Sequence, residues 1–283
     1  KLAAGDTLYI IANHLNAEGL AYGTTNPSHL LNVPAARMSA WPDAPDDLLQ
    51  WLKTPEAALA KQRLKVTREY SETDFIPRAL YAAYIQHIWQ QTQATATECG
   101  CLIKLVETTA TRIRTEGELA VLTARGDAIA VDDIVLACGN EIKHILPQIT
   151  SPNIIQNPWA KEAWEDAANW ASPVMLYGAG LTAVDTVLSL RSAGYKGTII
   201  AASRGGKWPA AHQPSSNAFQ FDKEELFAQQ TLQPLVRLVR QKIAAHGQWQ
   251  PVIDALRPHT PERWKRLSAC DQKRFLSRLL SLW

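Results

Sequence analysis

The chain has 283 residues, of which 46% are hydrophobic and 20% charged, and its formal net charge is +2. This composition is typical of a globular protein, and the balance of charge argues against nucleic acid or a membrane surface as the main partner. The cysteines Cys99, Cys101, Cys138 and Cys270 have no spacing typical of disulfides or metal ligands. We therefore expect reduced thiols in a cytoplasmic protein, with no metal.

Residue periodicity predicts a mixed succession of strands and helices. The first half is expected to contain a strand at 7–12, helices at 43–52 and 77–89, and a meander of three strands at 101–115, 118–123 and 128–137. The second half is expected to contain a Trp-rich linker at 152–172, a strand at 174–177, a helix at 181–193, a strand at 198–202 and cationic helices over 222–283, broken by Pro234, Pro251, Pro258 and Pro261.

The strongest chemical signal is VMLYGAGLTAVDTVLSL, residues 174–190, in which a strand, a glycine-rich bend and a helix follow one another. Gly178 permits the sharp turn, Gly180 permits close approach of a pyrophosphate, and Ala183 allows tight helix packing. The free amides of the first helical turn, at Leu181 and Thr182, would then hold the phosphates. The alternative is a tight turn in an unrelated α/β protein.

The end of the second strand of this unit selects between NAD and NADP. An acidic residue is expected there when a ribose 2′-hydroxyl is bound, but the sequence has Ser203 and Arg204, with Lys207 just beyond. A hydroxyl and a cation suit a 2′-phosphate, which favours NADP. Asp185, in the intervening helix, is either a positioning residue or a solvated charge.

Two further segments carry weaker signals. Residues 19–43, GLAYGTTNPSHLLNVPAARMSAWPD, have no helical or strand period, yet they are too apolar for an ordinary surface loop. Asp132 to Asn140, DDIVLACGN, combines an acidic residue, a buried strand and a small turn ending at Gly139 and Asn140. That pattern occurs where the meander of a flavoprotein returns to its dinucleotide, although any buried strand ending in glycine looks similar.

Taken in order, these motifs resemble a family. The segments are GLAYGTTNPSHLLNVPAARMSAWPD, DFIPRALYAAY, DDIVLACGN, NPW, YGAGLTAVD, SR and ALRPHTPERWKRLS. They are similar to bacterial FAD/NAD(P)-binding proteins, which are flavoproteins with two dinucleotide-binding domains, distantly similar to N-hydroxylating and Baeyer–Villiger-type flavin monooxygenases.

The resemblance implies that residues 19–43 fold over a flavin. The residues implied to lie along the isoalloxazine and pyrophosphate of FAD are Asn32, Val33, Pro34, Arg37 and Met38. The alternative is an Ω-type loop packed on its own leucines. Arg78 would reach a phosphate or carboxylate, or would be an exposed charge at a helix start.

The resemblance also has departures. In the family, a strand and a GxGxxG turn precede the position of Lys1, and the chain continues beyond the position of Trp283. The present chain is therefore expected to be the middle of a longer flavoprotein. Ala12-Asn13-His14 stands where an acidic residue usually binds the FAD ribose.

These observations favour an α/β fold with two Rossmann-like dinucleotide-binding domains, the first with a flavoprotein-type β-meander, and a C-terminal helical segment. The expected boundaries are an FAD-binding-type domain at 1–157, an NAD(P)-binding domain at 158–210 and helices at 211–283. The expected function is an NAD(P)H-dependent, monooxygenase-like flavin oxidoreductase that uses FAD and NADP and acts on a small-molecule substrate. No side chain stands out as a general base.

Two alternatives remain. One is a nucleotide-binding module without turnover, and the other is a flavin-free NADP-linked dehydrogenase. The sequence lacks the Ser-Tyr-x-x-x-Lys set of such dehydrogenases, and it lacks the GxSxG of hydrolases.

Overall fold

A computed structural model of the chain describes residues 3–13, 19–139, 148, 151–210 and 219–279. The chain divides into two compact units, Lys1–Pro209 and Ala210–Trp283, and each is considered by itself. Among the described residues, no helix has both the length and the apolar character needed to cross a membrane.

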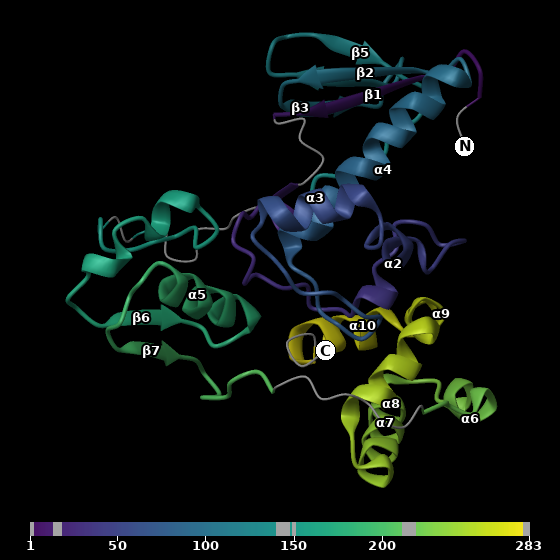
Figure 1. Cartoon of the computed structure of the whole chain (residues 1–283). Helices are drawn as coiled ribbons and strands as arrows, with labels where there is room; N and C mark the ends of the chain where they lie inside the picture. The colour runs from purple at the N-terminus through teal and green to yellow at the C-terminus, as the bar shows by residue number, and fades with distance from the viewer. Residues whose placement is uncertain (1–2, 14–18, 140–147, 149–150, 211–218, 280–283) are drawn as a thin grey trace. The chain divides into compact units, whose positions relative to one another are not determined.

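The first unit combines short strands with helices (Figure 1). Its strands are β1 (Thr7–Ala12), β2 (Leu102–Glu107), β3 (Ala110–Arg114), β4 (Ala120–Thr123), β5 (Ala128–Ala130), β6 (Val174–Tyr177) and β7 (Ile199–Ala202). Its helices are α1 (Gly19–Tyr22), η1 (Ala35–Arg37), α2 (Asp47–Trp51), α3 (Pro55–Arg63), α4 (Arg78–Glu98), η2 (Lys161–Trp164), η3 (Ala167–Asn169) and α5 (Leu181–Ser192).

Strand β1 is confirmed, and it pairs in parallel with β2, with Thr7 opposite Leu102 (Figure 1). The prediction of one strand over 101–115 is therefore wrong, because this stretch divides into β2 and β3. The two halves join different sheets: β2 lies beside β1, whereas β3 begins the antiparallel sheet β3-β4-β5. A parallel pair needs a long crossover, which α4 and the segments before it supply.

The meander is shorter than predicted. Its last strand, β5, ends at Ala130, and residues 133–139 have no regular structure. Val135 is 88% exposed and Leu136 is 71% exposed. The prediction that residues 134–137 form a buried strand is wrong, because no described strand pairs with them.

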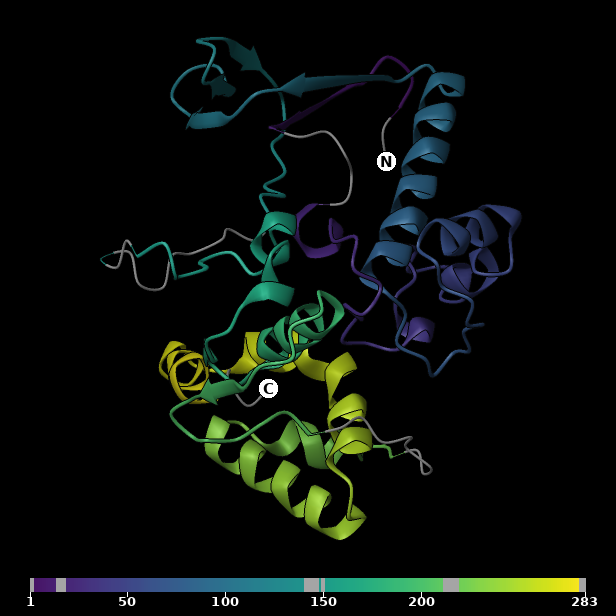
Figure 2. The same ribbon diagram turned by 60° about the vertical axis from the view of Figure 1, so that its left-hand side comes forward.

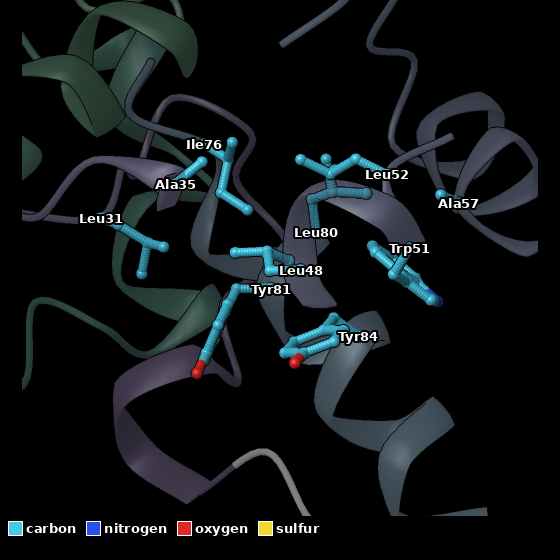
Figure 3. Packing of buried hydrophobic residues seen from close by; sticks show 10 residues of the cluster. All are labelled: Leu31, Ala35, Leu48, Trp51, Leu52, Ala57, Ile76, Leu80, Tyr81 and Tyr84. Atoms are coloured by element: carbon cyan, nitrogen blue, oxygen red, sulfur yellow. The ribbon is translucent and has the colours of Figure 1, made fainter. Parts of the chain in front are cut away.

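Residues 19–43 supply part of the principal core of the first unit. Figure 3 shows Leu31 and Ala35 from this segment together with side chains of α2, α3 and α4. The cluster consists of Leu31, Ala35, Leu48, Trp51, Leu52, Ala57, Ile76, Leu80, Tyr81 and Tyr84. Leu31 and Ala35 fill this core, and Tyr22 and Met38 pack against it, which accounts for part of the apolar character of the segment. Leu20 and Leu30 do not belong to it, because they are 39% and 42% exposed.

Helix bounds differ from the sequence expectation in three places. Helix α2 begins at Asp47 rather than at residue 43, and α4 continues to Glu98. Helix α3 was not predicted, because residues 53–73 are polar. Its start nevertheless carries a recognisable signal, since the Thr54 hydroxyl accepts a hydrogen bond from the Ala57 amide and Pro55 occupies the first turn.

The second unit is helical, as predicted, and α7 and α8 are also seen in Figure 2. Its helices are α6 (Lys223–Ala228), α7 (Leu232–His246), α8 (Trp249–Leu256), η4 (Arg257–His259), α9 (Thr260–Arg266) and α10 (Ala269–Arg278). Pro234, Pro251 and Pro261 lie in first helical turns, where the missing amide costs little. The core joins α6, α7 and α8 through Leu226, Leu238 and Val252, among others.

Candidate functional site

The bend between β6 and α5 has the geometry of a strand-to-helix turn. The strand at 174–177 is confirmed, and the helix begins at Leu181 as predicted. Gly178 has φ of +124°, which L residues rarely adopt, so glycine is required there. Its amide donates to the carbonyl of Ala202 at 2.8 Å, which fixes the bend beside the end of β7.

Gly180 has a different role from Gly178. It is the N-cap of α5 with φ of −89°, a conformation open to any residue, and a Cβ built there meets no atom within 4 Å. Protein packing therefore does not require glycine at this position. Among the described residues, no backbone hydrogen bond uses the amides of Leu181 or Thr182. Open space in front of free helix amides fits a bound phosphate.

The bend opens on a cleft of about 1340 Å³ lined by Gly178, Gly180, Thr182 and residues of β6. Leu20 and Ala21 of α1 and Arg78 at the start of α4 also line it. Most of the remaining lining comes from residues 152–173, which the sequence suggested only as a linker. Its tryptophans were the available signal, because Trp159, Trp164 and Trp170 all border the cleft.

Ser203 and Arg204 directly follow β7, whose last residue pairs with Tyr177 of β6. Both are exposed, and the amide of Gly206 donates to the Ser203 carbonyl at 3.2 Å in a tight turn. The link between Gly178 and Ala202 places this turn next to the glycine bend. In a βαβ unit, the second strand end is where the ribose of a dinucleotide is recognised.

Asp185 is buried, so of the two alternatives, a positioning residue or a solvated charge, the solvated charge is wrong. Its carboxylate accepts a hydrogen bond from Arg78 Nη2 at 3.4 Å. Arg78 also donates to the carbonyls of Leu30 and Ala21, and its guanidinium lies 5.3 Å from the ring centre of Trp159. Arg78 is therefore neither an exposed charge nor aimed only at a ligand, because it ties α4 and the 19–43 segment to α5.

A second polar link lies beside this ion pair. His29 is buried, and its Nε2 lies 2.6 Å from the hydroxyl of Ser189, which itself donates to the carbonyl of Asp185. The imidazole therefore donates from Nε2 and accepts at Nδ1 from Thr24, 2.7 Å away. Burial, and secondly the charge of Arg78, lower the pKa of His29, so the neutral ring is favoured.

Burial also acts on the acidic partner. It raises the pKa of Asp185 above its ordinary value, and Arg78 opposes this rise. Arg78 thus stabilises the charged form of this carboxylate inside the protein.

The buried face of α5 combines apolar and polar residues. Ala183 and Leu190 are buried, whereas Val184 and Val187 are half-buried and Leu188 is 38% exposed. Thr186 and Ser189 are buried instead. The helix presents a polar face to the 19–43 segment, and an apolar period does not reveal such a face.

The residues implied for the flavin do not line this cleft. Asn32 and Arg37 are exposed, Val33 and Pro34 are half-buried, and Met38 packs against the first core. The segment is held in place by backbone hydrogen bonds from Leu31 to Ile76 and from Ala35 to Asp74, both 2.9 Å.

The residues predicted to bind a dinucleotide where the chain leaves the β-meander do not line this cleft either. Asp132 and Gly139 are exposed, and Asn140 lies outside the described residues. Among the predicted site residues, Gly178, Gly180 and Thr182 share the cleft, whereas neither Leu181 nor Arg204 is among its lining residues. The assignment of FAD to the 32–38 segment stays a prediction.

Comparison with known proteins bears on the first half of the chain. Residues 7–141 match the model of a family described as FAD-NAD(P)-binding. No curated protein matches the chain at a significant level. The match covers β1 to β5 and the 19–43 segment, but it does not reach the bend at Gly178. It is consistent with FAD and NADP as cofactors, and an FAD/NAD(P)-binding domain fits a flavin-dependent oxidoreductase in general.

Proposed function

We propose that the protein is an NADPH-dependent flavin oxidoreductase of the monooxygenase type, acting on a small-molecule substrate. The observation that carries the proposal is the open space before Gly180, next to the free amides of Leu181 and Thr182. The FAD-NAD(P)-binding match over residues 7–141 supports a second nucleotide in the same chain.

The nicotinamide dinucleotide is assigned to the second part of the first unit. Its diphosphate would bind the amides that follow Gly180, and its 2′-phosphate would meet Arg204 and Ser203. Strands β6 and β7 are parallel and α5 joins them, so the three elements form one βαβ unit. We propose that residues 158–210 contain this NAD(P)-binding domain and that residues 1–157 are an FAD-binding domain of the same general class.

FAD is assigned to Asn32, Val33, Pro34, Arg37 and Met38, together with Asp132, Gly139 and Asn140. The exposed Asn32 and Arg37 side chains are accessible to polar groups of a ligand, and the fixed backbone of the segment would keep them in position. Bound together, the two nucleotides supply hydride transfer. The protein would orient them and exclude water.

The proposal predicts that the purified chain binds FAD and that NADPH added without oxygen bleaches the visible flavin bands. The measurement is an anaerobic absorbance titration after incubation with FAD and removal of the excess. The proposal is contradicted if NADPH bleaches the flavin bands no faster than buffer alone does. A colourless protein that still binds NADPH would instead identify a nucleotide-binding module without turnover.

Arg204→Gln is the matched variant for cofactor choice. It removes the cation expected at the 2′-phosphate, so the affinity for NADPH should fall roughly tenfold, as for loss of a charge-assisted bond. The affinity for NADH should stay unchanged, because NADH has no 2′-phosphate. Equal losses for both cofactors would place Arg204 away from the ribose.

A further inference from the structure

The second unit contains a groove that the proposed function does not use. It lies between α7 and α10 and has a volume of about 550 Å³. Four arginines line it, Arg237 and Arg240 from α7 and Arg274 and Arg278 from α10. Residues three or four apart lie on the same helix face, so each helix contributes two arginines to the lining of the groove.

Few acidic residues lie on the two helices to neutralise the charge of these arginines. Helix α7 contains no acidic residue, and Asp271 is the only one in α10. Asp271 is buried, accepts from the Leu232 amide at 3.1 Å and lies 3.4 Å from Arg274. In the described part of the chain, no ion pair involves Arg237, Arg240 or Arg278. The four arginines are exposed, and together they give the groove a positive potential that favours an anion.

Part of the positive charge outside the groove is neutralised by ion pairs, whereas Lys223, Lys265 and Lys273 are exposed. Elsewhere in the unit, Lys242 pairs with Glu225, Arg257 with Asp254 and Arg266 with Glu262. Arg263 is buried. A nucleic acid needs an extended basic track along which several phosphates can bind, whereas the four arginines gather in one groove of about 550 Å³. The distribution therefore favours a compact anion.

The groove also has apolar surface between its charges. Leu232, Val236, Ala244 and Leu279 contribute to its lining. The volume lies within the range of roughly 300–1000 Å³ that is usual for small-molecule sites. An anion that carries an apolar body would use both the arginines and this surface, whereas a bare inorganic ion would use only the arginines.

We propose that the groove between α7 and α10 binds a small organic anion with at least two negative charges, as phosphate or carboxylate, on an apolar body. The arginines of the two helices hold its charged end from opposite sides. Val236, Leu279 and their apolar neighbours contact its body. This site is independent of the dinucleotide sites proposed in the first unit.

Geranyl diphosphate is a suitable probe, and its binding to the full chain is measured by isothermal titration calorimetry. The double variant R237Q/R278Q should weaken its binding at least roughly tenfold, because two charge-assisted contacts are lost. R257Q is the matched control, since it removes an exposed arginine of the same unit that pairs with Asp254. R257Q should leave the binding of geranyl diphosphate unchanged. G180A should also leave it unchanged, and this result would show that the ligand does not bind at the diphosphate site proposed in the first unit.

Inorganic pyrophosphate and geraniol separate the two parts of the ligand, and each should bind more weakly than geranyl diphosphate. The single variant R240Q provides a second test if the double variant melts at a lower temperature. The inference is overturned if geranyl diphosphate does not bind, if it binds the arginine variants as tightly as the parent, or if pyrophosphate alone binds equally well.

Discussion

Replacing Gly180 by alanine should lower the affinity for NADPH at least roughly tenfold, because the new methyl group occupies the space that the diphosphate needs. The fold should be retained. The φ of −89° at Gly180 suits alanine, and the added Cβ meets no atom within 4 Å. Loss of the better N-cap residue should cost no more than about 1 kcal/mol of stability. Affinity is measured by quenching of protein fluorescence, and folding by thermal denaturation.

The matched control for this variant is Ser192→Ala, at the exposed far end of the same helix. It should change neither NADPH affinity nor the melting temperature by a measurable amount. If G180A binds NADPH as the parent does, the open space at the bend is not the diphosphate site.

Replacing Arg78 by methionine should destabilise the first unit by about 3 kcal/mol, because it leaves a buried carboxylate without its counter-charge. The side chains of Arg78 and of its partner Asp185 are 20% and 12% exposed, and Arg78 also donates hydrogen bonds to two backbone carbonyls. Asp185→Asn should be milder, about 1–2 kcal/mol, because the asparagine oxygen can still accept from Arg78, which also keeps its bonds to the carbonyls of Leu30 and Ala21. The free energies of unfolding come from urea titrations at neutral pH.

The same pair has a defined dependence on pH. Burial raises the pKa of Asp185 in the folded state, so its contribution to stability is lost as pH rises from the ordinary aspartate value through that raised pKa. R78M removes the charge that opposes the rise of this pKa, so the loss of stability should extend to higher pH. D185N removes the titrating carboxyl group and should abolish this dependence of stability on pH.

Arg68→Met is the control for these variants. Arg68 pairs with Asp74 at the surface, with 65% of its side chain exposed, so its loss should cost less than about 1 kcal/mol. If R78M costs no more than R68M, the contact between Arg78 and Asp185 does not hold the first unit together.

The parts that the sequence predicted best depend on local physics. The strand at 174–177, the bend and helix α5 follow from an apolar run, two glycines and a helical period, all within a few residues. The same holds for β1 and for the helices of the second unit. Helix α3 was missed although Thr54 and Pro55 marked its start, because its apolar period is weak.

The parts that were not predicted depend on contacts between distant residues. A strand over 101–115 looked continuous, but β2 pairs with β1, nearly a hundred residues earlier in the chain, so the stretch divides. The burial of Asp185 follows from Arg78, 107 residues away, and that of His29 from Ser189. Leu31 and Ala35 of the 19–43 segment belong to a core completed by α2 and α4. Periodicity within a segment does not identify such partners.

The most direct test of the account follows the backbone amides of the bend by NMR while NADP is added to the full chain, labelled with nitrogen-15. The resonances of Gly180, Leu181 and Thr182 should move with the added nucleotide, together with those of Ser203 and Arg204, while amides of β3 to β5 stay in place. Binding that leaves the three bend amides unmoved would contradict the assignment of the diphosphate to this helix terminus.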